Sequence, residues 1–260
     1  MRKIVVTLVA VSGLIFAPQA DAWGKTGHRV TGAIAENYLS RRAKRAIDDI
    51  LTDEDLAEVS TWADFYRSDP DEFWQRKAGP FHYVTIPVGK RYADVGAPPQ
   101  GDAITALEMF AEVLLDDDAS AEDKKRALHF TVHIIGDLHQ PLHAGNGTDR
   151  GGNQYTVVWY GEVTNLHSVW DTGLVKQEEL SYTEYTTWLL RKISREQAAA
   201  WMEPDPLVWV AESAAIRDTI YPGGDRNLRW DYFFAHRDTV RQRLSQGGVR
   251  MAAYLNELFK

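Results

Sequence analysis

A helix that a proline must end is the strongest constraint that this sequence places on its fold. Apolar side chains recur there at the spacing of one helical face: Leu128, Val132 and Ile135. Upstream, Ser120 and Asp123 resemble a capping box, which starts a helix. Pro141 cannot continue the helix, because it lacks a backbone N–H and its ring clashes with the preceding turn. The sequence therefore predicts a helix from about Ala121 to about Leu138.

The same periodicity recurs along the chain and indicates a mainly α fold. Two further apolar stripes have helical spacing: Val30, Ala33, Ile34 and Tyr38, then Ile104, Leu107, Phe110 and Leu114. Residues 206–221 and 229–259 also have helical patterns; Pro222-Gly223-Gly224 separates them, and Gly247-Gly248 marks the second. The one strand-like stretch, residues 153–167, predicts a short β-hairpin. We expect a single multi-helix domain over residues 23–260.

The first residues have the pattern of a secretory signal peptide. Met1-Arg2-Lys3 precedes an apolar run from Ile4 to Ala17, and the small-x-small triplet Ala20-Asp21-Ala22 follows. The run is shorter than the ~20 residues that a transmembrane helix needs. We therefore predict that residues 1–22 are a signal peptide, that cleavage precedes Trp23, and that the protein is periplasmic or secreted without a membrane anchor.

Charge and cysteine content narrow the classes of function. The formal net charge of −8 argues against the basic surface of a duplex-DNA binder. Bound cations can still reverse the sign locally, so an acidic chain can act on a polyanion. The chain has no cysteine, so disulfides and thiolate ligands are excluded. Any metal must bind to nitrogen and oxygen atoms.

Two His-x3-Asp pairs predict a metal site. His133 and Asp137 lie one turn apart on the predicted helix, and His143 follows just beyond the proline. His167 and Asp171 repeat the spacing. Because exported proteins bind zinc through histidine and carboxylate, we predict zinc. Three other histidines are interpreted as ordinary core or surface residues: His129, His139 and His236.

Several motifs together resemble the zinc-dependent type I nuclease family, whose type members are nuclease S-one and nuclease P-one. They occur in the family's order: Trp23, Gly27-His28, Trp62-Ala63-Asp64, Phe81-His82, His133-x3-Asp137-x5-His143, Gly151-Gly152-Asn153 and Asn165-Leu166-His167-Ser168-x-Trp170-Asp171. The matching positions extend from Trp23 to Asp171.

The resemblance implies three zinc ions. The first would be held by Asp64, His82, His133 and Asp137. The second would be held by the amine and carbonyl of Trp23, by His28, and by Asp137 as a bridging ligand. The third would be held by His143, His167 and Asp171. An α-amino group titrates near ~8, so it can bind a metal close to neutral pH. Signal cleavage would thereby complete the site.

The resemblance also implies the reaction: hydrolysis of RNA and single-stranded DNA to 5′-phosphate products, with 3′-nucleotidase activity. Two cations that share a carboxylate can lower the pKa of a shared water and supply hydroxide, which Asp64 would orient. Arg67 would bind a phosphate oxygen, or be a solvated surface residue. Tyr83 would stack on a base, or belong to the core. Asn153 would contact a base edge, or serve only its turn.

Two other functions stay open at this point. A zinc-dependent phospholipase C resembles this family in fold and in its N-terminal Trp, but its last cluster ligand is typically glutamate, where this chain has Asp171. A non-catalytic periplasmic zinc-binding protein would need neither Arg67 nor open coordination positions. The sequence gives no sign of a protein partner, and we expect a monomer with single-stranded nucleic acid as its substrate.

Overall fold

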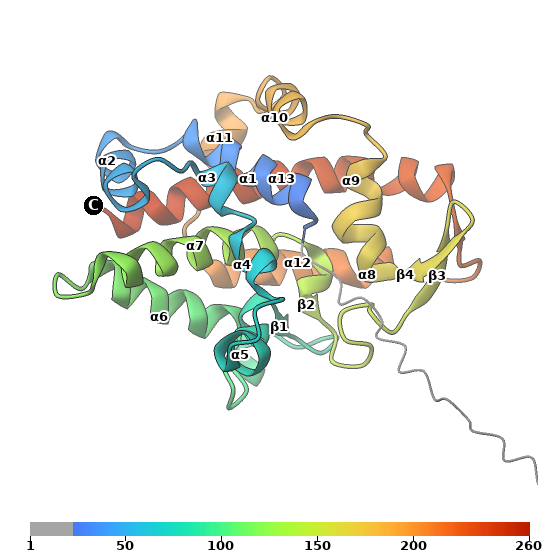
Figure 1. The fold of residues 1–260 in the computed structure, drawn as a ribbon. Helices are drawn as coiled ribbons and strands as arrows, with labels where there is room; N and C mark the ends of the chain where they lie inside the picture. The colour runs from blue at the N-terminus through green and yellow to red at the C-terminus, as the bar shows by residue number, and fades with distance from the viewer. Residues whose placement is uncertain (1–22) are drawn as a thin grey trace, which may run out of the picture.

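The protein is mainly helical, in a computed structural model that describes residues 23–260 (Figure 1). The predicted signal peptide lies outside the described residues. The longer helices are α1 (Lys25–Glu36), α2 (Arg41–Leu51), α6 (Ala103–Leu115), α7 (Ala121–Leu138), α10 (Tyr182–Leu190), α12 (Pro206–Ile220) and α13 (Trp230–Leu258). The shorter helical segments are α3 (Leu56–Val59), α4 (Trp62–Tyr66), α5 (Tyr92–Val95), α8 (Leu166–Ser168), α9 (Leu174–Lys176) and α11 (Arg195–Trp201). The predicted mainly α fold is confirmed.

Non-α turns occur at several points along the chain. Two are π-helical, η1 (Phe73–Lys77) and η4 (Val169–Gly173), and two are 3-10 helices, η2 (Gly79–His82) and η3 (Pro141–His143). The segment α8–η4–α9 is continuous, so its π turn lies inside a longer helical run. Such turns are frequent at functional sites in proteins.

Two small sheets complete the fold. The predicted hairpin is confirmed as β3 (Thr156–Trp159) paired antiparallel with β4 (Glu162–Asn165), and β5 (Asn227–Leu228) adds a parallel strand on the other side of β3. The second sheet pairs β1 (Val84–Thr85) in parallel with β2 (Ala144–Gly145). The expectation of a single strand-like stretch is therefore incomplete, because these two-residue strands carry no alternation that a sequence pattern can reveal.

The predicted helix before Pro141 is confirmed as α7, which spans Ala121–Leu138. Ser120 caps it, since its hydroxyl oxygen accepts a hydrogen bond from the backbone N–H of Asp123. Every residue of α7 from Ala127 to Leu138 is buried. This half of α7 packs against α1, α4, α6, α12 and α13, so its polar residues face protein rather than water.

The C-terminal helix passes through its two glycines without a break. Gly247 and Gly248 lie inside α13, where it runs beside α1 (Figure 1). A Cβ atom at Gly248 would lie 2.4 Å from the Cβ of Ile34, so only glycine permits this close approach. The same packing fixes α1, which carries His28. Among residues 23–260, no helix is both long and apolar enough to cross a membrane.

Candidate metal centre

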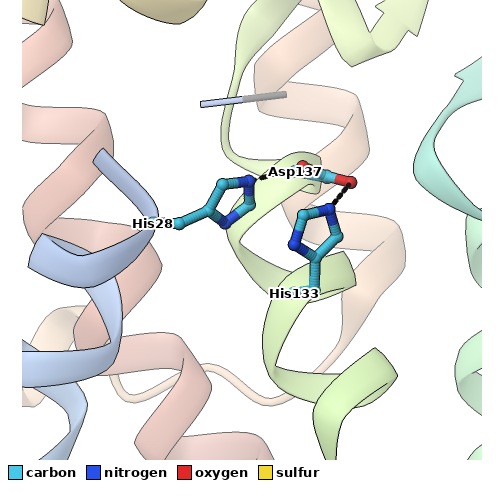
Figure 2. Close-up of side chains that lie close together, drawn as sticks. All are labelled: His28, His133 and Asp137. Atoms are coloured by element: carbon cyan, nitrogen blue, oxygen red, sulfur yellow. Dashed lines mark ion pairs between the residues drawn. The ribbon is translucent and has the colours of Figure 1, made fainter. Parts of the chain in front are cut away.

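Two long helices and five shorter helical segments bring the predicted ligands together. His28 comes from α1, and His133 and Asp137 come from α7; Figure 2 shows both histidine rings directed at the carboxylate of Asp137. Asp64 comes from α4 and His82 from η2. The remaining three ligands follow the end of α7: His143, His167 and Asp171. All eight side chains are buried.

The two oxygens of the Asp137 carboxylate have different neighbours. Its Oδ1 lies 3.2 Å from Nε2 of His28. Its Oδ2 lies 3.0 Å from Nδ1 of His82 and 3.2 Å from Nε2 of His133. A Cβ atom at Gly136 would lie 2.8 Å from Nδ1 of His28, so the glycine lets α1 approach α7 at this point. The two oxygens therefore serve different neighbours, as a bridging ligand requires.

His133 also contacts two other predicted ligands near this carboxylate. Nε2 of His133 lies 3.0 Å from Nδ1 of His82 and 3.7 Å from Oδ1 of Asp64. These contacts define two ligand groups that share His133: His28–His133–Asp137 and Asp64–His82–His133. The resemblance implied Asp137 as the residue shared by two zinc ions, and in the structure Asp137 contacts residues of both groups.

A third group lies beside the first two. Nε2 of His167 lies 3.1 Å from Oδ2 of Asp171, and Nε2 of His143 lies 3.9 Å from Oδ1. Together these side chains can hold a metal ion. The buried amide nitrogen of Gln140 donates to the same Oδ1 of Asp171, so Gln140 positions this carboxylate. Gln140 lies within the motif around Pro141, but its role was not predicted.

Backbone carbonyls orient three of the histidines. Nδ1 of His133 donates to the carbonyl of Ser60 at 2.7 Å, and Nδ1 of His167 donates to that of Gly151 at 2.6 Å. Nδ1 of His143 donates to the carbonyl of His82 at 2.5 Å. A carbonyl only accepts, so each Nδ1 carries a proton, and Nε2 is the ring nitrogen of each histidine that can bind a metal.

A buried arginine aligns two ligand segments. Nη1 of Arg217 donates to the carbonyls of Ile86 and Ala144, at 2.7 Å and 2.5 Å. Ala144 belongs to β2, which begins directly after His143, and Ile86 directly follows β1, the strand after His82. Arg217 thus joins α12 to both segments, and no spacing in the sequence indicates this role.

The donor atoms fit zinc. Several buried atoms in the groups have no hydrogen-bond partner: Nε2 of His28, Oδ2 of Asp64, Oδ1 of Asp137, Nε2 of His143 and Oδ2 of Asp171. Leaving buried polar atoms unpaired is costly, so such a concentration of them indicates an ion-binding site. Imidazole nitrogen and carboxylate oxygen are ligands that zinc accepts, and the chain has no thiolate to compete.

The beginning of the domain lies against this centre. Trp23 is fully buried among apolar side chains, and the backbone N–H of Gly24 donates to the carbonyl of Asp171 at 2.7 Å. His28 lies on the first turns of the helix that follows. Trp23 and Gly24, the first described residues, therefore lie close to Asp171 of the third ligand group and just before His28.

Burial and charge set the protonation of the metal-free site. Burial opposes ionisation of Asp137, but neighbouring His133 and His143 hold its pKa well below its ordinary value. Burial lowers the pKa of His143 to about 3 and raises that of Asp171 to about 6. Burial would also lower the pKa of His133, but Asp137 and Asp64 outweigh it and raise this pKa to about 9.

Zinc binding should therefore release protons near pH 8. With a pKa of about 9, His133 is protonated at that pH and must lose its proton before Nε2 can bind a metal. We expect release of about one proton per chain from His133, measured by calorimetric titration of the zinc-free protein in buffers of different ionisation enthalpy. Heats that do not depend on the buffer would contradict this assignment.

The three predicted substrate residues differ in their surroundings. Nη1 of Arg67 lies 3.5 Å from Oδ1 of Asp64, and its side chain is 25% exposed, so it lies beside the ligands and reaches solvent. Tyr83 directly follows His82 and is 44% exposed, which removes the alternative of a core residue. Asn153 is half-buried, and its amide nitrogen donates to the carbonyl of Arg150 within its own turn.

The remaining histidines lie outside the three ligand groups. His129 is buried beside Glu54, His139 is buried and bonds to the carbonyl of Ile135, and His236 packs against Trp170 and Tyr232. Their interpretation as ordinary packed residues is consistent with these contacts.

Comparison with known protein families matches residues 23–260 to the S1/P1 nuclease family. The fold and the clustered ligands define a helical domain built around a candidate metal centre, and the match covers all of it. The chain belongs to the S1/P1 nuclease family. It is accordingly a nuclease, a hydrolase of phosphodiester bonds in nucleic acids.

Several proteins with similar sequences are named nucleases or endonucleases. Endonuclease 4 of Arabidopsis thaliana is 32% identical, over 92% of this chain and 90% of that protein. Endonuclease 2 of the same plant is 29% identical, over 98% of this chain and 97% of its own length. Nuclease S1 of Aspergillus oryzae is 28% identical, over 95% of this chain and 96% of its own. The likeness therefore extends along the whole length of these nucleases.

Proposed function

We propose that the chain is an exported zinc-dependent endonuclease that hydrolyses RNA and single-stranded DNA to 5′-phosphate products and has 3′-nucleotidase activity. The observation that carries this proposal is the position of Asp137, whose two oxygens face His28 on one side and His82 with His133 on the other. A carboxylate placed in this way can bridge two cations. Membership of the nuclease family supplies the reaction class.

We assign the zinc ligands as three sets. The first consists of Asp64, His82, His133 and Asp137; the second of the Trp23 amine and carbonyl, His28 and Asp137; the third of His143, His167 and Asp171. The ligand groups in the structure support the side-chain assignments. The burial of Trp23 and the bond from Gly24 to Asp171 support placing the new N-terminus beside the centre.

Zinc bound at these sites would supply Lewis acidity and lower the pKa of water enough for attack on phosphorus near neutral pH. Asp64 would orient the attacking water, since its buried Oδ2 has no hydrogen-bond partner and can accept a proton. Arg67, 3.5 Å from Asp64, would bind a phosphate oxygen and offset the charge that develops there.

Two residues would contact the bases. The exposed ring of Tyr83 follows a zinc ligand directly, so a base next to the scissile phosphate could stack on it. Asn153 has one amide N–H committed to Arg150, and its remaining amide groups would contact a base edge. Stacking accepts every base, which suits a nuclease with little sequence preference.

We further propose export to the periplasm or the exterior, with cleavage before Trp23, and a monomeric enzyme. The family match begins at residue 23, which supports a mature domain that starts there. N-terminal sequencing of the exported protein tests the cleavage, and a first residue other than Trp23 would overturn the assignment of its amine as a ligand.

A substrate panel tests the proposed activity. Zinc-loaded protein that begins at Trp23 is incubated with single-stranded RNA, single-stranded DNA, a 3′-mononucleotide and phosphatidylcholine vesicles, and each reaction is repeated after chelation. We expect hydrolysis of the first three substrates, 5′-phosphate ends on the polymer products, and loss of activity on chelation.

The panel separates the alternatives. Release of phosphocholine from the vesicles with no cleavage of nucleic acid would favour a phospholipase C. Zinc binding without hydrolysis of any substrate would favour a non-catalytic zinc-binding protein. Full activity after complete removal of zinc would overturn the metal-dependent mechanism.

A further inference from the structure

An exposed aromatic ring and a lysine meet at the edge of the candidate metal centre. The ammonium of Lys25 lies 4.0 Å from the centre of the Phe65 ring, which is 51% exposed. Lys25 is also exposed, and none of the ion pairs among residues 23–260 includes it. Within the part of the chain that the structure describes, the ammonium therefore contacts one ring face, and such a contact at an exposed site is weak. Lys25 can therefore exchange this contact for an anion at little cost.

Phe65 and Lys25 are each close in the sequence to candidate ligands. Phe65 directly follows Asp64, and consecutive Cα atoms are about 3.8 Å apart. Lys25 lies between Trp23 and His28 in the sequence and follows Gly24, whose N–H bonds to the carbonyl of Asp171. A strand with its phosphate at the metal centre would therefore pass close to this ring and this ammonium.

Phe65 is set apart from the aromatic packing around it. In the same helix, Trp62 and Tyr66 lie 4.5 Å apart by ring centroids, and Trp74 lies 5.1 Å from Trp62. Phe65 takes part in none of the ring–ring contacts within residues 23–260, and its aromatic contact is with a cation. Packing of the core therefore does not account for this phenylalanine.

We propose that Lys25 and Phe65 form a binding subsite for one nucleotide of a single-stranded substrate, with the base stacked on Phe65 and a phosphate bound by Lys25. This inference rests on the proposed function, because it requires a single strand to reach the metal centre. A ring face beside an unpaired ammonium matches the two parts of a nucleotide, a flat base and an anionic phosphate. Because the whole chain is negatively charged, a local cation such as Lys25 favours the approach of a polyanion.

The test measures binding of a fluorescent oligothymidylate with phosphorothioate linkages, which slow cleavage, to zinc-loaded protein. We expect Phe65→Ala to raise the dissociation constant about tenfold. Lys25→Gln should reduce the slope of log affinity against log salt by about 0.7, the value for one phosphate contact on a single strand.

A second ligand separates stacking from general damage to the site. An abasic oligomer of the same length keeps the phosphates and lacks the bases. The wild type should prefer the base-bearing oligomer, and Phe65→Ala should reduce that preference about tenfold. Equal losses of affinity for both oligomers would overturn base stacking on Phe65.

The chain offers a matched control. Phe234 is 66% exposed and lies under Arg237 at 4.5 Å, on α13, which carries none of the candidate ligands. Phe234→Ala should leave the dissociation constant unchanged. Equal dissociation constants for the wild type and Phe65→Ala would overturn the subsite, even if the wild type cleaves nucleic acid. Loss of affinity in Phe65→Ala, in a protein that cleaves no nucleic acid, would support the subsite and overturn the proposed function.

Discussion

Replacing Asp137 by asparagine should remove the two zinc ions assigned to this carboxylate and lower hydrolysis of single-stranded substrate roughly 10³-fold. The wild-type carboxylate offers one oxygen to His28 and the other to His82 and His133. An asparagine of the same shape offers one neutral oxygen and an NH₂ group, which donates and cannot bind a cation. Zinc content by elemental analysis and initial rates on the same preparation measure both effects.

Asp102→Asn is the matched control for a buried aspartate with a purely structural role. Asp102 caps α6, and its Oδ1 accepts from the N–H groups of Ile104 and Thr105. Asparagine caps a helix as well as aspartate does, so this substitution should change the melting temperature little and should leave zinc content unchanged. A full complement of zinc in the Asp137→Asn protein would contradict the bridging role of Asp137.

One residue added before Trp23 should remove one zinc ion and lower activity roughly 100-fold. The addition converts the α-amine into an amide, whose nitrogen has no lone pair to bind a metal. Zinc content and hydrolysis rate are compared between protein that begins at Trp23 and protein with a single extra alanine.

An alanine added after Lys260 controls for the extra residue itself. The C-terminal lysine is exposed and lies beyond the end of α13, so the addition should change neither zinc content nor rate. If the N-terminal and C-terminal additions behave alike, the Trp23 amine is not a ligand, and the second zinc site must be assigned to other atoms.

Some of the candidate ligands could be predicted from spacing alone, whereas His28, Asp64 and His82 were assigned only through the resemblance to the nuclease family. His133 and Asp137 are four residues apart on one helix, and His143 follows the proline that ends it. The residues that orient them were not predictable in the same way. Ser60 contributes only a backbone carbonyl, and Arg217 reaches its two carbonyls from a distant helix. Contacts made by backbone atoms leave no residue preference for a single sequence to reveal.

The fold shows the same division between local and distant signals. Periodicity gave α7 its bounds, and alternation of β-branched and aromatic residues gave the β3–β4 hairpin. The two-residue strands β1, β2 and β5 were missed because their pairing depends on partners far away in the sequence. Two of them nonetheless lie next to candidate ligands, since β1 begins two residues after His82 and β2 begins directly after His143.

We propose that buried histidines and aspartates assemble a zinc centre that cleaves single-stranded nucleic acid. Counting zinc and assaying cleavage of single-stranded RNA in one preparation that begins at Trp23 tests this directly. We expect three zinc ions per chain and products with 5′-phosphate ends, with both the zinc and the cleavage lost on chelation. A preparation that cleaves RNA equally well with no bound zinc would show that the centre is not the catalyst.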